Sequence, residues 1–226
     1  MRMKDRIVVL VKAFSELGLK AAEKMVEEGA SAVILLGSEE ESQKGEALKE
    51  KYPQTIYFLA VNTGDISAME AAAASVEKDF GKIDTMVNLQ DETASGGLME
   101  ITDSDWERVI EANLSELYYS AHAFIPMMKK NQSGRVVVLT SVAGRTAGDF
   151  DIAYSASKTG AMGFVRGLAM EEREQGITVN SIAAGDLMDP EIEKAVIHAI
   201  LYLGSDEAPW TTGDCMDVNG GVFMQN

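Results

Sequence analysis

Short apolar runs rich in β-branched residues alternate with longer amphipathic stretches along the whole chain. The runs predict about seven strands, at residues 6–11, 32–36, 55–60, 85–89, 135–140, 178–183 and 215–218. Helical periodicity fills the intervals, and its longest stretches are residues 103–128 and 153–175. Apolar strands that are each followed by a helix are typical of a parallel sheet covered on both faces. The pattern therefore predicts one α/β domain over residues 1–226, with a doubly wound, Rossmann-like parallel sheet.

Composition narrows the classes of partner. The chain has 20 Lys and Arg against 36 Asp and Glu, a net charge of −16, which disfavours nucleic acids and anionic membrane surfaces. Its single cysteine, Cys215, cannot form an intramolecular disulfide, and its two histidines lack metal-ligand spacing. No apolar run reaches transmembrane length. We expect a cytoplasmic protein that acts on a small molecule, without a metal, a nucleic acid or a membrane.

One candidate for chemistry is a tyrosine and a lysine on the same helix face. Tyr154 and Lys158 are four positions apart in the predicted helix 153–175. A nearby ammonium lowers the pKa of a phenol, which makes Tyr154 a candidate general acid or base. Ser141 follows strand 135–140, at the rim where a doubly wound sheet binds ligands, and its hydroxyl can bind a substrate oxygen. A surface Tyr/Lys pair and a turn serine remain alternatives.

A second candidate is Asn113, which falls inside the predicted helix 103–128. Asparagine is unfavourable in mid-helix because its amide competes for backbone hydrogen bonds. Its apolar neighbours Ile110, Leu114 and Leu117 indicate a buried polar role, and a solvent-facing asparagine remains the alternative.

Several blocks in order resemble the short-chain dehydrogenase/reductase family: residues 135–144, 154–158, 176–180 and 218–221. The resemblance extends over nearly the whole chain. It implies that Ser141 polarises a substrate carbonyl or hydroxyl and that Tyr154 exchanges the proton. It also implies that Lys158 holds the nicotinamide ribose and that Asn113 anchors a water in the proton relay.

The phosphate-binding turn departs from the pattern of that family. The family has Thr-Gly-x-x-x-Gly-x-Gly, whereas residues 11–18 read Val-Lys-Ala-Phe-Ser-Glu-Leu-Gly. Gly18 is kept, but Lys12 and Glu16 replace the glycines that allow the tight turn and the close approach of the pyrophosphate. We expect the Glu16 carboxylate to face the pyrophosphate and dinucleotide binding to be weak.

The other cofactor positions expected from the resemblance are Asn88, Lys158 and Gly185. Asn88 begins Asn-Leu-Gln-Asp where the family has Asn-Asn-Ala-Gly, so Asp91 stands at a glycine position. The second strand ends in Leu36-Gly-Ser-Glu-Glu40, and an acidic residue there can bind a ribose diol. No basic residue is evident there for a 2′-phosphate, which favours NAD over NADP.

We therefore expect an NAD(H)-dependent oxidoreductase of weak activity as an isolated chain. Its substrate would be a secondary alcohol or ketone, with a 3-hydroxyacyl thioester as one possibility. The altered turn and the short segment 185–205, where the family commonly has a longer lid, leave two alternatives open. One is a non-catalytic subunit of a hetero-oligomeric dehydrogenase that has lost dinucleotide binding. The other is a cofactor-free acid–base enzyme on the same scaffold.

The long helices also predict self-association. Helices 103–128 and 153–175 carry apolar residues on more than one face, and the C-terminal run 221–226 is apolar for a chain end. We expect a homo-oligomer, either a dimer or a tetramer, because most soluble oligomers are homomeric. A hetero-oligomer with an intact homologous subunit is the alternative.

Overall fold

The computed structural model of this protein describes residues 1–146 and 151–224. Within them, seven strands form one sheet in the order β3-β2-β1-β4-β5-β6-β7, and every neighbouring pair is parallel. In chain order the strands are β1 (Ile7–Val11), β2 (Ala32–Gly37), β3 (Ile56–Ala60), β4 (Thr85–Asn88), β5 (Gly134–Ser141), β6 (Ile177–Ala184) and β7 (Cys215–Val218). The predicted doubly wound sheet is confirmed.

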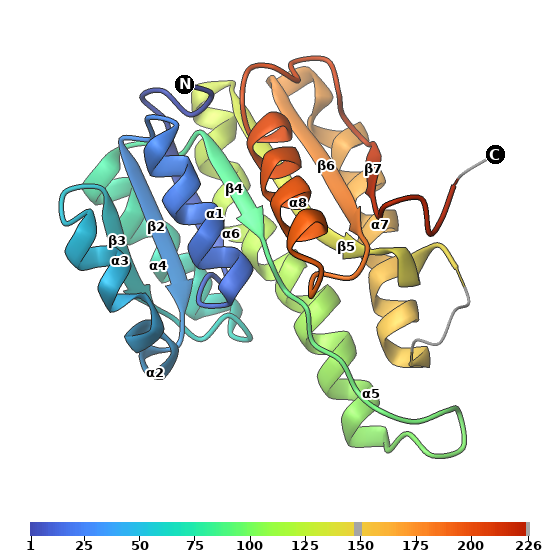
Figure 1. Cartoon of the computed structure of the whole chain (residues 1–226). Coiled ribbons are helices and arrows are strands. Elements are labelled where there is room, and N and C mark those ends of the chain that lie inside the picture. The colour runs from blue at the N-terminus through green and yellow to red at the C-terminus, as the bar shows by residue number, and fades with distance from the viewer. Residues whose placement is uncertain (147–150, 225–226) are drawn as a thin grey trace.

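Helices cover both faces of the sheet (Figure 1). Side chains of α1 (Glu16–Glu27) and α8 (Pro190–Leu203) share one apolar core with the strands. The opposite core is built by α4 (Ile66–Phe80), α6 (Glu116–Asn131) and α7 (Ile152–Glu172). In the described residues, no helix is both long and apolar enough to cross a membrane.

Shorter helical segments complete the chain. The connection from β2 to β3 contains α2 (Glu39–Ser42), a 3-10 turn (Gln43–Gly45) and α3 (Glu46–Lys51). Further 3-10 turns follow β5 (Val142–Gly144) and α7 (Arg173–Gln175).

The stretch predicted as one helix over residues 103–128 is continuous but irregular. It begins with α5 (Asp103–Ile110), widens into a π-helical turn (Glu111–Ser115) and continues as α6. Figure 1 shows α5 and the loop before it extending away from the sheet. Single π turns inside α-helices frequently occur at functional sites, and this one contains Asn113.

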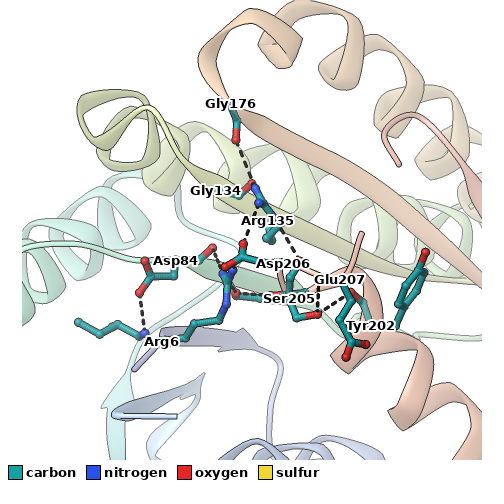
Figure 2. Close-up of polar contacts among 12 residues, drawn as sticks. Arg6, Asp84, Gly134, Arg135, Gly176, Tyr202, Ser205, Asp206 and Glu207 are labelled. Atoms are coloured by element: carbon teal, nitrogen blue, oxygen red, sulfur yellow. Dashed lines mark hydrogen bonds and ion pairs between the residues drawn. The ribbon is translucent and has the colours of Figure 1, made fainter. Parts of the chain in front are cut away.

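A network of ion pairs and hydrogen bonds lies at the amino end of the sheet (Figure 2). Arg6 precedes β1 and Arg135 lies in β5, and both side chains are only 10% exposed. The Asp206 carboxylate, after α8, pairs with both: Arg135 Nη2 lies 2.9 Å from its Oδ1, and Arg6 Nη2 contacts the same oxygen. Arg135 also donates to the carbonyl oxygens of Gly134 at 2.8 Å and Ser205 at 3.2 Å. These ion pairs link the segment after α8 to β5 and to the residue before β1.

Candidate active site

The predicted chemical side chains gather at the carboxyl end of the sheet. Strand β5 ends at Ser141 and β6 ends at Ala184, and these two residues are register partners. A pocket of about 650 Å³ opens above them, and its lining includes Ser141, Tyr154 and Gly185. Because ligands of doubly wound proteins bind outside the carboxyl ends of the strands, this pocket is the candidate substrate site.

Helix α7 presents Tyr154 to this pocket. Asp151 caps the helix, and its Oδ1 accepts a hydrogen bond from the Tyr154 backbone N–H at 2.6 Å. Ser141 Oγ accepts from the Ala143 N–H at 3.2 Å, and the Ser141 side chain is also hydrogen-bonded to that of Tyr154. Two hydroxyls, one from a strand end and one from a helix, thus meet at the pocket wall, where both can contact one substrate oxygen.

Asp91 lies between Tyr154 and Lys158. The Tyr154 hydroxyl donates to Asp91 Oδ1 at 2.6 Å, and Lys158 Nζ lies 3.0 Å from the same oxygen. Lys158 Nζ also donates to the Gln90 carbonyl oxygen at 2.6 Å. The Lys158 side chain is 1% exposed, whereas that of Asp91 is 37% exposed. The carboxylate therefore balances a buried ammonium while keeping contact with solvent.

These contacts reverse the expected effect on the tyrosine. Burial raises the pKa of Tyr154, and the Asp91 charge and its hydrogen bond raise that pKa further. The hydrogen bond from Ser141 opposes the shift, and Asp151 adds to it. Burial lowers the pKa of Lys158, and Asp91 acts in the opposite direction. The predicted fall in the pKa of Tyr154 is therefore wrong for this chain, because burial and the Asp91 carboxylate raise that pKa.

Asn113 is buried, with 3% of its surface exposed. Its Oδ1 accepts from the Glu92 N–H at 2.8 Å, and its Nδ2 donates to the Glu92 carbonyl oxygen at 2.7 Å and to Ser157 Oγ at 3.0 Å. The side chain thus ties the segment after β4 to α7 and fixes the backbone next to Asp91. The predicted role of Asn113 as a water anchor stays a prediction.

The phosphate-binding turn keeps a left-handed residue at Lys12 and a glycine at Gly18. Lys12 adopts φ 57°, the left-handed conformation that glycine adopts freely. A Cβ at Gly18 would lie 2.2 Å from the Ala13 carbonyl oxygen, so glycine is required there. The expectation for Glu16 is wrong: its side chain is 80% exposed and pairs with Lys20 Nζ, one helical turn away, at 2.7 Å. The amino end of α1 is therefore not blocked by this carboxylate.

A cleft beside the turn matches a dinucleotide in its chemistry. Lys12, Ser15, Lys44 and Gln90 line one pocket of about 220 Å³, and the carboxylates Glu41, Asp91 and Glu92 line it as well. In the described residues, the buried Gln90 Oε1 has no hydrogen-bond partner, so an acceptor is available there for a ribose hydroxyl. Ammonium groups suit phosphates, and an open helix terminus binds anions. The two lysines and the open terminus of α1 suit a phosphate group, whereas the carboxylates in the same lining suit ribose hydroxyls rather than phosphates.

The outer part of the cleft is a second pocket of about 360 Å³, lined among others by Lys12, Ser38, Glu39 and Asn62. Glu39 supplies the carboxylate expected for a ribose diol. Lys12 corrects the expectation that no basic group lies near this region, because its side chain lines both pockets.

The remaining predicted cofactor residues differ in accessibility. Asn88 is 1% exposed, and its Nδ2 donates to Ser120 Oγ at 3.1 Å, so its side chain holds β4 against α6. Gly185 lines the substrate pocket, and a Cβ there would lie 2.9 Å from the Asn219 Cα. Lys158 is already held by Gln90 and Asp91.

Sequence reasoning noted Asp91 only as a lost glycine. Its partners lie 63 and 67 positions later, at Tyr154 and Lys158, and no local pattern joins them. The signal that was available is chemical: an acidic residue three positions after the end of β4, a strand whose carboxyl end lies near the Tyr/Lys pair. The role of Lys44 in lining the cleft was also missed, because α2 and the following 3-10 turn read as one solvated helix.

Comparisons with known proteins agree on one family. The family model described as short chain dehydrogenase matches residues 6–199. The chain is 28% identical over 249 residues to the 3-oxoacyl-[acyl-carrier-protein] reductase FabG of Vibrio harveyi, covering 99% of this chain and 100% of that protein. It is equally identical over 247 residues to the protein of the same name from Escherichia coli K12, with the same coverage.

Solved structures share the fold. A putative short-chain dehydrogenase/reductase from Burkholderia xenovorans superposes with a TM-score of 0.89 at 22% identity, covering 97% of each chain. Levodione reductase superposes with a TM-score of 0.86 at 24% identity, covering 97% of this chain and 98% of its own. The family match, the parallel sheet and the assembled hydroxyl pair lead to one assignment: this chain belongs to the short-chain dehydrogenase/reductase family of oxidoreductases.

Proposed function

We propose that this protein reduces a ketone to a secondary alcohol, and catalyses the reverse oxidation, with NAD(H). The observation that carries the proposal is the meeting of the Ser141 and Tyr154 hydroxyls at the wall of the 650 Å³ pocket. Hydroxyl donors from two elements can bind the same carbonyl oxygen and stabilise the negative charge that develops on it. The cleft lined by Lys12 and Gln90 adjoins this pocket, since Asp91 lines both.

Each side chain then has a defined task. Ser141 donates a hydrogen bond to the substrate oxygen and fixes its position. Tyr154 transfers its hydroxyl proton to that oxygen in reduction and receives a proton from it in oxidation. Lys158 keeps the Gln90–Asp91 backbone in place through the Gln90 carbonyl oxygen. The nicotinamide group, when bound, supplies or accepts the hydride.

The cofactor assignment rests on the cleft. The Lys12 and Lys44 ammonium groups would bind the pyrophosphate, and Gln90 Oε1 and Asp91 would accept hydrogen bonds from the nicotinamide ribose. Glu39 in the outer pocket favours a free ribose diol and repels a 2′-phosphate, which supports NAD, although Lys12 in the same pocket reduces the preference.

The pocket favours a neutral substrate with an apolar substituent. Its lining combines apolar side chains with the carboxylates Asp91, Asp151 and Asp186; the apolar members are Leu139, Val142, Leu187, Met188 and Val222. A 3-oxoacyl thioester has this character at its reacting end. The names of the similar reductases make such a thioester the first candidate to test.

The same observations favour this activity over the two alternatives. The proton-transfer side chains are assembled within this chain, which a purely supporting subunit would not require. The dinucleotide cleft keeps its turn at Lys12 and its packing at Gly18, which a cofactor-free enzyme would not require. We further propose that the protein acts in the cytoplasm as a homo-oligomer.

The test is a reductase assay on the purified chain. With NADH and a short 3-oxoacyl thioester, we expect loss of reduced-nicotinamide absorbance, and NADPH should serve less well. Tyr154→Phe should lower turnover by about 10²–10⁴-fold without changing the melting temperature much. Tyr57→Phe, on the far edge strand β3, is the matched control and should leave turnover unchanged. Absence of turnover with thioesters and simple ketones, for either cofactor, would contradict the proposal.

A further inference from the structure

The Asp91 carboxylate touches both members of the Tyr/Lys pair. Its Oδ1 lies 2.6 Å from the Tyr154 hydroxyl oxygen and 3.0 Å from Lys158 Nζ. It lines the substrate pocket and the cofactor cleft alike, and 37% of the side chain is exposed. A half-exposed carboxylate hydrogen-bonded to a buried hydroxyl connects that hydroxyl to solvent.

The placement of Asp91 is held from several sides. The Gln90 carbonyl oxygen, one residue before, accepts from Lys158 Nζ at 2.6 Å. The Glu92 backbone, one residue after, exchanges two hydrogen bonds with the Asn113 amide, at 2.7 and 2.8 Å. Buried donors and acceptors therefore fix the backbone on both sides, and the contact with Tyr154 is part of a built arrangement rather than a mobile surface carboxylate.

The charges around Tyr154 oppose a free phenolate. The groups that face its hydroxyl are Asp91 from the segment after β4, Ser141 from β5, and Asp151 and Lys158 from α7. The single ammonium of Lys158 is balanced by Asp91, and Asp151 adds a second negative charge. Tyr154 can therefore take a proton from an alcohol only if it releases its own proton in the same step. The acceptor in contact with that proton is Asp91 Oδ1.

We propose that Asp91 is the proton acceptor and donor behind Tyr154, completing a relay from substrate through Tyr154 to Asp91 and solvent. In oxidation, the substrate O–H bond breaks as its proton forms a bond to Tyr154 Oη. The former Tyr154 proton passes to Asp91 Oδ1, and the substrate C–H hydride goes to the oxidised nicotinamide. Water then takes the proton from Asp91. Reduction runs the same steps backwards, from the protonated carboxyl group. The catalytic part of this inference rests on the proposed function.

One test needs no turnover. The ultraviolet absorbance of the tyrosines is titrated to alkaline pH in the wild type, in Asp91→Asn, and in each with Tyr154→Phe added. Asp91→Asn removes the negative charge and the hydrogen-bond acceptor that oppose ionisation of Tyr154, so Tyr154 should ionise at lower pH than in the wild type. The phenolate gained should vanish when Tyr154 is removed. Identical curves for the wild type and Asp91→Asn would overturn the relay, whether or not a substrate is known.

The second test follows alcohol oxidation against pH. Asp91→Asn should lose about 100-fold or more in kcat/KM at neutral pH and recover at alkaline pH, as the Tyr154 phenolate forms beside Lys158. Asp91→Glu, which keeps a carboxylate, should retain more activity at neutral pH than Asp91→Asn. Asp103→Asn, an exposed carboxylate in the first turn of α5, controls for the loss of one charge and should behave as the wild type. A pH profile of Asp91→Asn that superposes on that of the wild type would overturn the relay. No turnover in any variant would instead count against the proposed function alone.

Discussion

Lys12 stands where the family motif has a glycine, yet its backbone has the conformation that glycine favours. The residue occupies the first glycine position and adopts the left-handed conformation, at φ 57°. This conformation costs a residue with a Cβ about 1–2 kcal/mol. Lys12 also lines both pockets of the cofactor cleft. Backbone strain at this residue is therefore accompanied by a positive charge where phosphates are expected.

Lys12→Gly should separate these two effects. Relief of the left-handed strain should raise the free energy of unfolding by about 0.5–1 kcal/mol, after the higher entropy of glycine in the unfolded chain is counted. NADH affinity should fall several-fold, because the ammonium is lost. Urea unfolding and fluorescence titration measure the two quantities.

Lys12→Ala is the matched variant for this pair of effects. It removes the charge but keeps a Cβ in the left-handed conformation, so its affinity should fall without the gain in stability. Wild-type affinity in both variants would show that Lys12 does not bind the cofactor.

For single residues, the sequence predicted which side chains form the candidate site better than it predicted the charges and hydrogen bonds around them. Ser141 and Tyr154 could be placed together because the strand–helix pattern brings both to the same end of the sheet. The environment depends on Asp91, whose partners come from distant parts of the chain. The direction of a side chain could not be predicted from the pattern either. Glu16 occupies the expected position, but its carboxylate pairs with Lys20 on the same helix.

At the level of elements, Asp206, which follows α8, pairs with Arg6 before β1 and with Arg135 in β5. Burial alone would raise the pKa of Asp206, but the Arg6 and Arg135 charges outweigh it and lower that pKa. A carboxyl with a lowered pKa in the folded state stabilises the fold above its unfolded pKa, about 3.9. This contribution is lost as the pH falls through the folded pKa.

Asp206→Asn should therefore destabilise the protein at neutral pH and have less effect in acid. The Asp206 side chain is 78% exposed, so solvent screening limits the expected loss to about 1 kcal/mol at pH 7. The difference from the wild type should shrink below about pH 4. Urea unfolding at several pH values measures it. Glu207→Gln removes the adjacent carboxylate, which pairs with the half-exposed Arg2, and serves as the control. A loss that is constant with pH would contradict the ionic explanation.

Element boundaries were predictable where a single periodicity of apolar residues continued through the element, as in the strands and in α7. The π turn between α5 and α6 was not, because helical periodicity continues across it. Asn113 within this turn is hydrogen-bonded to Glu92 and Ser157, which are distant in sequence, so no local pattern indicates these contacts.

At the scale of the whole molecule, exposed apolar side chains support the predicted self-association. Tyr118 on α6 is 45% exposed, Trp106 on α5 is 40% exposed, and Met99 in the loop before α5 is 92% exposed. Of the apolar C-terminal run, residues 225 and 226 lie outside the described residues.

Light scattering at micromolar concentration should therefore give the mass of a dimer or a tetramer. Tyr118→Glu should reduce the mass if α5 and α6 form the contact. Trp210→Glu, near β7, tests a second contact that only a tetramer would need. A monodisperse monomer of the unaltered chain would refute association, and recovery of a second, related chain with it from the native host would support the hetero-oligomer.

The short link between β6 and α8 has a kinetic consequence. Residues 185–189 pass directly from the strand into the helix, and Met188 in this link is 88% exposed. In many enzymes a segment closes over the active site, and its opening limits the rate of product release. With so short a link, products can leave without a large rearrangement, so bond breaking rather than departure should govern the turnover rate. The same openness admits water to the reacting groups, so we expect the chemical step to be slower than it would be in a closed site.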